Sequence, residues 1–423
     1  MINAIVICEY NPFHLGHLRQ LELIRARLGS DVTITAVMSG SFVQRGEFAC
    51  APKYERAAAA VKCGCDLVLE LPYPWSCSSA EFFARGAVSI ADALGVYDVL
   101  CFGCESIGAS DSPPCGACAT ETSPHTSTPS VSDLPDTPER KKITYTPEEA
   151  AAVGRFREYL ARRISLEPLQ RPERAGGSKL RAAEALYREK YGEDVFYPVS
   201  PNDILAAEYI DALERIGSNL VPVPLPRIRG LSATASRAAL ERGDRDALQR
   251  LVPPQTLALF ESRGTPVSSE RLGPALPMFF RLADPAELAK CCDADGGIAA
   301  RLCSAAQKSL SASELYENAL AKHVTRAKIR RAALNCLFGV TYDEVGAPPP
   351  YTSLLAANSS GTALLREIKK RSRIPVVTKP ADYRALPPEA ARAFERCARA
   401  DGIYMLACGD RGDPLTLTPA ILP

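Results

Sequence analysis

The sequence predicts an α/β fold, in which a doubly wound parallel sheet is followed by a mainly helical C-terminal region. Two observations support this prediction. In the first hundred residues, short apolar runs alternate with longer segments of helical periodicity. From about residue 250 onward, almost every segment has a helical pattern. Because parallel strands need crossover helices between them, regular alternation is typical of a parallel sheet with helices on both faces.

The first part of the chain contains four expected strands and three expected helices. Each strand is a short apolar run bounded by polar or turn residues, as in "DLVLELP", and each helix places its large apolar residues mostly three or four positions apart. The expected strands are residues 2–10, 31–38, 66–72 and 98–103. The expected helices are residues 16–29, 51–64 and 79–95.

The alternation stops after residue 106, and the sequence then predicts three further segments. Residues 107–143 are rich in Ser, Thr, Pro and Asp, which predicts a flexible insertion because this composition cannot bury enough apolar surface to order itself. Residues 144–245 complete the α/β domain with helices at 146–162, 177–192, 200–217 and 232–243 and a proline-limited edge strand at 220–230. Asn202 is placed to cap the helix at 200–217. Residues 246–423 form the mainly helical C-terminal region.

Composition and charge indicate an ordinary globular protein. The 423 residues carry a formal net charge of +1, so an anionic partner must be met by a local basic patch. No apolar run approaches the roughly 18–20 residues of a membrane span, and no signal peptide is evident. We therefore expect a cytoplasmic protein that does not contact a membrane.

Fifteen cysteines are an unusual number, and four of them have spacing that suits a metal. Cys101 and Cys104 are followed by Cys115 and Cys118, so that two CxxC pairs are close in the chain. This spacing permits a tetrahedral zinc site. We do not expect zinc, because Cys101 belongs to an apolar strand and the second pair lies in the expected insertion. Incidental thiols are the preferred interpretation.

The stretch "EYNPFHLGH" holds two of the four histidines, His14 and His17, where the first strand gives way to the first helix. A helix N-terminus offers free backbone N–H groups and a positive dipole end, which favour phosphate. Two imidazoles beside it supply donors for charge that develops on a phosphoryl group during transfer. Gly16 lacks a Cβ, so a nucleotide has room to approach the backbone. Helix capping without a ligand is the alternative, and a metal pair is less favoured because no third ligand is nearby.

Several motifs together resemble a known family. "EYNPFHLGH" looks like the HxGH signature of nucleotidyltransferases, and with "VMSGSFVQRGEFA", "DLVLELP", "FGCES", "SPNDILAAEYI" and "SATASR" it resembles the tRNA(Met) cytidine acetate ligase family. The resemblance implies a HIGH-type, Rossmann-like nucleotidyltransferase domain. It also implies an activity: ATP and acetate form acetyl-adenylate, and the acetyl group passes to N4 of the wobble cytidine of elongator tRNA(Met). Mg²⁺ is expected with ATP.

The resemblance also implies site residues. His14 and His17 are the expected catalytic residues. The expected ATP contacts are Ile7, Glu9, Asn11, Pro12, Phe13, His14, Gly16, His17, Gln20, Gly103, Asn202 and Arg227. Candidate phosphate contacts are Ser39, Arg45, Ser232, Thr234 and Arg237.

Two basic segments of the C-terminal region are the expected RNA-binding surface, because phosphate backbones require dense positive charge. Their residues are Lys322, Arg326, Lys328, Arg330 and Arg331 in the first, and Lys369, Lys370, Arg371 and Arg373 in the second. Two other functions stay open. They are a small-molecule adenylyltransferase of cofactor synthesis and a non-catalytic RNA-binding protein.

Overall fold

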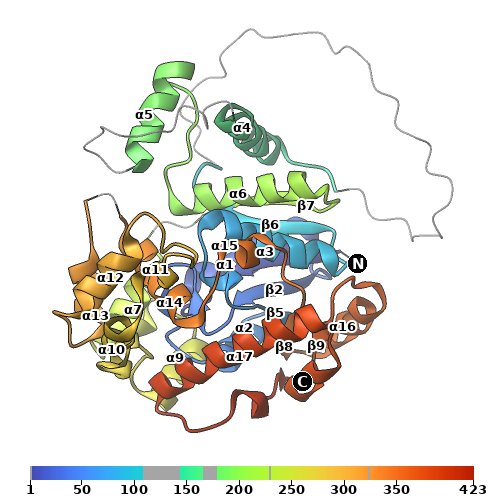
Figure 1. Ribbon diagram of the computed structural model, residues 1–423. Coiled ribbons are helices and arrows are strands. Elements are labelled where there is room, and N and C mark those ends of the chain that lie inside the picture. The colour runs from blue at the N-terminus through green and yellow to red at the C-terminus, as the bar shows by residue number, and fades with distance from the viewer. Residues whose placement is uncertain (1, 108–142, 165–178, 228–229, 323) are drawn as a thin grey trace.

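The computed structural model describes residues 2–107, 143–164, 179–227, 230–322 and 324–423. A sheet with the strand order β10-β8-β5-β2-β1-β6-β7 forms its centre, and β9 pairs with β8 (Figure 1). The strands are β1 Asn3–Cys8, β2 Thr33–Ser39, β5 Leu67–Leu71, β6 Val99–Cys104, β7 Val221–Pro226, β8 Thr352–Ala357, β9 Val376–Val377 and β10 Ala420–Ile421. A separate hairpin consists of β3 Phe42–Val43 and β4 Glu47–Phe48.

The N-terminal strands pair in parallel, as the alternating pattern predicted. In the centre of the sheet, Ile5 of β1 is in register with Thr35 of β2 and Leu100 of β6. β7 continues the sheet beyond β6 and forms its edge. Its sequence VPVPLP contains three prolines, which lack the N–H that a further strand would need. The predicted edge strand is therefore confirmed.

Helices cover both faces of this sheet, so the predicted doubly wound α/β class is confirmed. One apolar layer contains Leu21 and Ile24 of α1 and Ala57 of α2. The opposite layer contains residues of α3, α4, α6 and α16, among them Phe83 and Phe156. The helices are α1 Leu15–Leu28, α2 Lys53–Lys62, α3 Ala80–Ala93, α4 Pro147–Ile164, α5 Lys179–Tyr191, α6 Pro201–Ile216 and α16 Ser359–Arg371.

The helices between α6 and β8 pack beside the sheet (Figure 1). α10 to α14 share a hydrophobic core of their own, whereas α7, α8 and α9 pack around Cys50 and Ala51. The helices are α7 Ala233–Glu241, α8 Arg245–Gln249, α9 Pro254–Arg263, α10 Ala275–Leu282, α11 Pro285–Leu288, α12 Ile298–Ala306, α13 Ala312–Ala319, α14 Arg326–Phe338 and α15 Tyr342–Gly346, followed near the C-terminus by α17 Pro388–Cys408. Within the described part of the chain, no helix combines the length and apolar character that crossing a membrane requires.

The C-terminal region contributes strands to the central sheet, which its helical pattern did not predict. β8 pairs antiparallel with β5, and β10 and β9 each pair in parallel with β8. The sheet therefore crosses the predicted boundary between residues 245 and 246. The predicted insertion at 107–143 falls, except for its first and last residues, outside the described residues.

A buried charged cluster joins the C-terminal helix to the sheet. The Lys53 ammonium on α2 lies 2.6 Å from Glu70 of β5 and 2.7 Å from Asp401 of α17. The Asp401 carboxylate also accepts a 2.6 Å hydrogen bond from Ser41. Burial opposes a charge on Lys53, but Asp401 and Glu70 outweigh that effect and raise the pKa of Lys53. Glu70 and Asp401 with Cys397 have the spacing of a metal site, but the Lys53 ammonium already contacts both carboxylates.

Candidate active site

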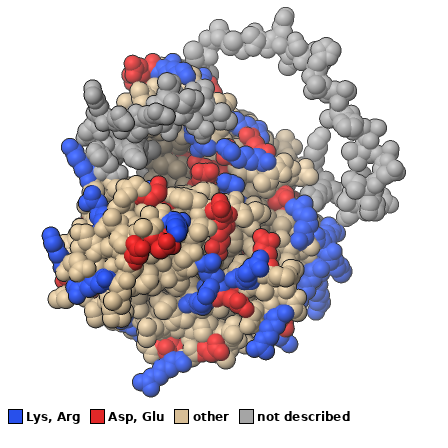
Figure 2. Space-filling view, viewed as in Figure 1, with Lys and Arg blue, Asp and Glu red and all other residues tan. Residues whose placement is uncertain are grey.

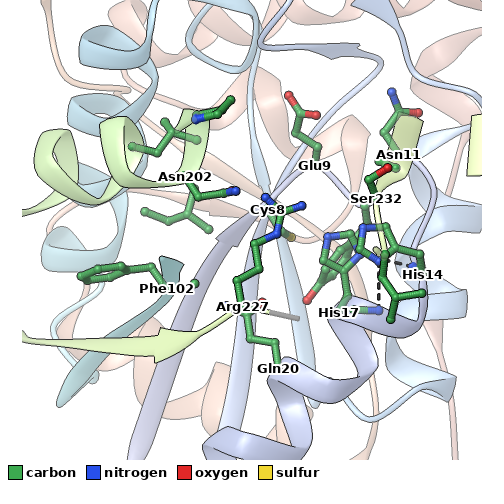
Figure 3. A pocket seen from close by; sticks show the side chains of 18 of the residues that line it. Cys8, Glu9, Asn11, His14, His17, Gln20, Phe102, Asn202, Arg227 and Ser232 are labelled. Atoms are coloured by element: carbon green, nitrogen blue, oxygen red, sulfur yellow. Dashed lines mark hydrogen bonds between the residues drawn. The ribbon is translucent and has the colours of Figure 1, made fainter. Parts of the chain in front are cut away.

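A pocket of about 390 Å³ opens at the carboxyl ends of β1, β6 and β7 (Figure 3). This is the edge at which open α/β sheets bind ligands, and the volume lies within the roughly 300–1,000 Å³ of small-molecule sites. Fourteen of the predicted site residues line it: Ile7, Glu9, Asn11, His14, Gly16, His17, Gln20, Arg45, Gly103, Asn202, Arg227, Ser232, Thr234 and Arg237.

The two histidines form the N-terminal cap of α1. His14 is the N-cap residue, and its Nδ1 accepts a 3.0 Å hydrogen bond from the Gly16 N–H. The His17 Nδ1 in turn accepts a 3.2 Å hydrogen bond from the His14 N–H. The two rings are stacked with their centroids 3.7 Å apart. The same two residues therefore cap α1 and line the pocket.

Burial and neighbouring charges determine the protonation of both rings, and the cap determines their tautomer. Burial is the main cause that lowers the pKa of His14 to about 4, and the charges of Arg227 and Arg237 add to it. Burial, followed by His14 and Arg227, lowers the pKa of His17 well below its usual value. Both imidazoles are therefore neutral near pH 7. Because each Nδ1 accepts a hydrogen bond, the single ring hydrogen is on Nε2, and each ring offers one Nε2–H donor.

Gly16 packs closely against the ring of His14 and also lines the pocket. A Cβ at this position would lie 2.8 Å from Cε1 and 2.9 Å from Nδ1 of His14. The absence of a side chain thus makes room for the capping ring. At Gly103, in contrast, a Cβ would meet nothing within 4 Å, so the end of β6 leaves open space beside the pocket.

Cationic and hydroxyl groups gather near the start of α7. Ser232 is its N-cap and accepts a hydrogen bond from the Ala235 N–H at 3.2 Å. Arg237 donates to the Asn11 carbonyl at 2.8 Å and lies 3.6 Å from the Glu47 carboxylate. Arg45, at the turn of the β3–β4 hairpin, is exposed. A helix N-terminus with arginines beside it suits an anion.

Two acidic residues also belong to the pocket. Glu9 accepts a 2.9 Å hydrogen bond from the Gln44 N–H, and burial is the main cause that raises its pKa. Glu47 pairs with both Arg237 and Arg330, so its charge is balanced by two cations. Glu47 was not among the predicted site residues, although it lies within the "QRGEFA" part of a motif that carries the family resemblance.

The Asn11 amide is held on one side only. Its Oδ1 accepts a 2.7 Å hydrogen bond from the Cys50 N–H. Its Nδ2 is buried and donates to no other described group.

Asn202 does not cap α6, contrary to the prediction. Ser200 is the N-cap, with its Oγ accepting from the Asp203 N–H at 3.0 Å. Asn202 instead donates to the Glu105 carboxylate at 2.7 Å, and Arg227 donates to the same carboxylate at 2.9 Å. Sequence reasoning missed Glu105. The signal was its position directly after a strand that ends at the ligand-binding edge.

Three predicted residues are not part of the pocket lining. Phe13 is 1% exposed and packs on Tyr10 with ring centroids 4.6 Å apart, and the adjacent Pro12 is buried. Ser39 is completely buried within β2, and its carbonyl accepts from Arg56 at 3.0 Å. These three residues are buried beneath the loop and the strand that carry the pocket lining.

The first predicted RNA-binding segment lies near the pocket but is largely neutralised. Gly46 of the β3–β4 hairpin packs against the α14 backbone at Arg330 and Arg331. Four of the five cations make ion pairs, and Lys322 is exposed. The pairs are Arg326–Glu317, Lys328–Asp295, Arg330–Glu47 and Arg331–Asp293.

The second predicted segment lies near the amino end of β6, whereas the pocket opens at the carboxyl ends of the strands. The Arg373 N–H donates to the Ala93 carbonyl, and Gly95 packs against Arg371, just before β6 begins. Figure 2 shows a concentration of Lys and Arg at the right, where Figure 1 places α16. Lys370 pairs with Glu367 and Arg373 with Asp92, whereas Lys369 and Arg371 are exposed and make no ion pair within the described ranges.

The two thiols of the first CxxC pair lie on opposite faces of the sheet. Cys101 packs in the apolar layer with α1 and α2, whereas Cys104 packs in the layer on the other face. Burial raises the pKa of both thiols, that of Cys104 to about 11. Cys115 and Cys118 lie outside the described residues.

Comparison with known proteins agrees with this geometry. The family model described as HIGH Nucleotidyl Transferase matches residues 1–413. Curated relatives named tRNA(Met) cytidine acetate ligase include one from Alkaliphilus metalliredigens, 31% identical over 95% of this chain and 93% of its own. Another, from Acetivibrio thermocellus, is 29% identical over 95% of this chain and 94% of its own. The chain belongs to the tRNA(Met) cytidine acetate ligase family.

A solved structure of this ligase family has the same fold over the whole chain. Thermotoga maritima TmcAL bound with alpha-thio ATP superposes with a TM-score of 0.82 and 27% identity, covering 100% of both chains. The apo form of the same protein also gives a TM-score of 0.82. The predicted HIGH-type nucleotidyltransferase fold is thus confirmed.

Proposed function

We propose that this protein is an ATP-dependent tRNA(Met) cytidine acetate ligase. The observation that carries the proposal is the capped histidine pair, which presents two neutral Nε2–H donors at the mouth of a helix N-terminus. The names of its relatives and the analogue bound to Thermotoga maritima TmcAL support the assignment.

The first step joins acetate to AMP. An acetate oxygen attacks the α-phosphorus of ATP, the bond from that phosphorus to the bridging oxygen breaks, and pyrophosphate leaves. We assign His14 and His17 to donate hydrogen bonds to the phosphoryl oxygens, where negative charge grows. Because both rings are neutral and already oriented by the cap, little reorganisation is needed. Arg45, Arg237 and Ser232 would hold the departing pyrophosphate.

The second step moves the acetyl group to RNA. The wobble cytidine N4 attacks the acetyl carbonyl carbon, AMP leaves with the electrons of the C–O bond, and N4 loses one proton. The cytidine must be splayed from its loop to reach the pocket. We assign the apolar lining formed by Phe102, Leu205 and Tyr209 to the nucleoside end of ATP. A tRNA substrate implies a cytoplasmic location.

Mg²⁺ would enter with the nucleotide. The carboxylates of the pocket lining, Glu9 and Glu47, already accept hydrogen bonds or ion pairs from Gln44, Arg237 and Arg330. No cluster of three metal-ligating side chains occurs at the pocket within the described ranges. Mg²⁺ commonly keeps several waters and binds substrate phosphates, and these residues fit that mode and not an all-protein cage.

Direct acetylation tests the function. Protein, ATP, Mg²⁺ and radiolabelled acetate are incubated with transcribed elongator tRNA(Met), and the nucleosides are separated after digestion. We expect label in N4-acetylcytidine and release of AMP and pyrophosphate. A transcript with uridine at the wobble position is the matched control and should stay unlabelled. Folded protein that labels neither transcript would contradict the proposal.

A further inference from the structure

Glu105, in the turn after β6, accepts hydrogen bonds from three donors, two at the start of α6 and one directly after β7. Its carboxylate accepts hydrogen bonds from Ser200 Oγ at 2.6 Å, Asn202 Nδ2 at 2.7 Å and Arg227 at 2.9 Å. Asn202 and Arg227 line the pocket, whereas Glu105 does not. Glu105 therefore reaches the pocket only through the two side chains that it holds.

The turn that carries Glu105 is itself held firmly. The Asp203 carboxylate, which is buried, accepts from the Glu105 N–H at 3.0 Å and the Ser106 N–H at 3.3 Å. Glu105 in turn accepts from Ser200 and Asn202 on the same first turn of α6. The turn after β6 and the start of α6 are thus joined in both directions: Asp203 of α6 accepts from the turn, and Glu105 of the turn accepts from α6. These hydrogen bonds fix the position of Glu105.

The contact with Glu105 decides which way the Asn202 amide faces. A carboxylate offers only acceptors, so the amide must present its NH₂ group to Glu105. The Asn202 Oδ1 then remains as an acceptor, and it receives no hydrogen bond from the residues that the structure describes. Figure 3 shows Asn202 and Arg227 side by side in the pocket, with the histidines beyond Arg227.

We propose that Glu105 is a positioning residue for nucleotide recognition: it orients Asn202 so that Oδ1 accepts a hydrogen bond from the nucleoside of ATP, and it holds Arg227 beside that contact. This inference rests on the proposed function, because it requires ATP in the pocket. The nucleoside carries such donors in the adenine amino group and in the ribose hydroxyls. A site built to bond a donor rejects an analogue that lacks it, because the buried acceptor is left unpaired.

Analogue binding to the wild-type protein identifies the donor. Dissociation constants are measured by calorimetry for ATP, 2′-deoxy-ATP, 3′-deoxy-ATP and purine riboside triphosphate, which lacks the 6-amino group. We expect one analogue to bind about tenfold or more weakly than ATP. If all three analogues bind as tightly as ATP, the proposal is overturned.

The Glu105→Gln variant then tests the positioning role. A glutamine can donate to Asn202, so the amide is free to turn and present its NH₂ group to the pocket. We expect ATP to bind about tenfold more weakly. The discrimination is the dissociation constant of the weakest-binding analogue divided by that of ATP, and we expect it to fall to threefold or less. Glu214→Gln is the matched control, because Glu214 lies on α6 like Asn202 but forms an exposed ion pair with Arg157 of α4, and its loss should leave the discrimination unchanged.

The ratio of the dissociation constants for the analogue and for ATP separates a positioning role of Glu105 from a general loss of structure. Unfolding or loosening of the turn weakens ATP and the analogue equally, and thermal denaturation monitors it directly. Unchanged discrimination in Glu105→Gln would overturn the inference. Failure of the proposed function has a different signature, namely wild-type protein that does not bind ATP, or that binds it and acetylates no tRNA while the discrimination persists.

Discussion

At the scale of single residues, the histidine pair has two roles in one arrangement. The spacing HxGH placed His14 and His17 at the start of a helix, and this much was predictable from the sequence. The tautomer was not, because it depends on which backbone N–H each Nδ1 accepts. Nor was the close packing of the His14 ring against Gly16, since it depends on the rotamer that the cap selects.

Titration of the histidines by NMR checks their protonation. Because burial lowers the pKa of His14 to about 4, its Cε1–H signal should titrate near pH 4 in the free protein. In the unfolded chain, the pKa of each histidine is nearer its usual value of 6.5. The unfolded state therefore binds protons that the folded state does not, and His14 and His17 should reduce stability as the pH falls from about 6.5 towards 4. Bound triphosphate should move the midpoint upward. A midpoint near 6.5 in the free protein would contradict the buried, capped arrangement.

The Gly16→Ala variant tests the cap. The added methyl group would clash with the His14 ring, so we expect the ring to move and acetylation to fall by tenfold or more, while the fold persists. Gly154→Ala is the control, because Gly154 is exposed within α4 and a Cβ there meets nothing within 4 Å. That change should raise helix stability by up to about 1 kcal/mol without altering activity. Full activity in Gly16→Ala would show that the cap is dispensable.

At the scale of secondary structure elements, the site depends on strand ends and helix starts that meet at one edge of the sheet. Local patterns predicted β1, β6, β7, α1, α6 and α7, and parallel pairing brings their ends together. The pattern could not distinguish which polar residue at the start of α6 caps the helix. Ser200 does so, which leaves Asn202 free to contact Glu105.

The two basic segments differ in charge balance and in position, and this difference leads to a prediction. Lys369 and Arg371 on α16 are exposed and make no ion pair within the described ranges. Changing both to alanine should weaken tRNA binding. It should also reduce the slope of log affinity against log salt concentration by the equivalent of about one to two phosphate contacts. Filter binding at several salt concentrations measures this effect, and acetate-dependent pyrophosphate exchange should stay the same.

Lys290→Ala serves as the control for that pair, since Lys290 is exposed and paired with Glu287 in a different helix–loop region. Unchanged tRNA affinity in the α16 variant would remove this segment from the RNA surface. The α14 segment, which lies beside the pocket, would then be the remaining candidate.

At the scale of the whole molecule, the C-terminal region completes the sheet on which the site is built. β5 ends at Leu71 and β8 begins only at Thr352, and local periodicity carries no information about such a distant pairing. The same limit explains why Lys53, Glu70 and Asp401 were not recognised as a cluster. Their three positions come from α2, β5 and α17, and only the folded chain brings the charges together.

The buried cluster should be important for stability. Lys53→Met leaves the carboxylates of Glu70 and Asp401 buried beside each other without a cation, which should cost about 3–5 kcal/mol. Urea denaturation measures the change. The exposed ion pair of Arg157 with Glu214 is the comparison, and Arg157→Met should cost no more than about 1 kcal/mol. Equal effects in the two variants would show that burial of the cluster is unimportant.

Acetate-dependent exchange of labelled pyrophosphate into ATP tests the central claim most directly, because it isolates the step assigned to the histidine pocket. We expect exchange in the wild-type protein with acetate and without tRNA, and loss of at least a hundredfold in His17→Ala, which should remain folded by circular dichroism. Exchange that does not depend on acetate, or that persists undiminished in His17→Ala, would contradict the account.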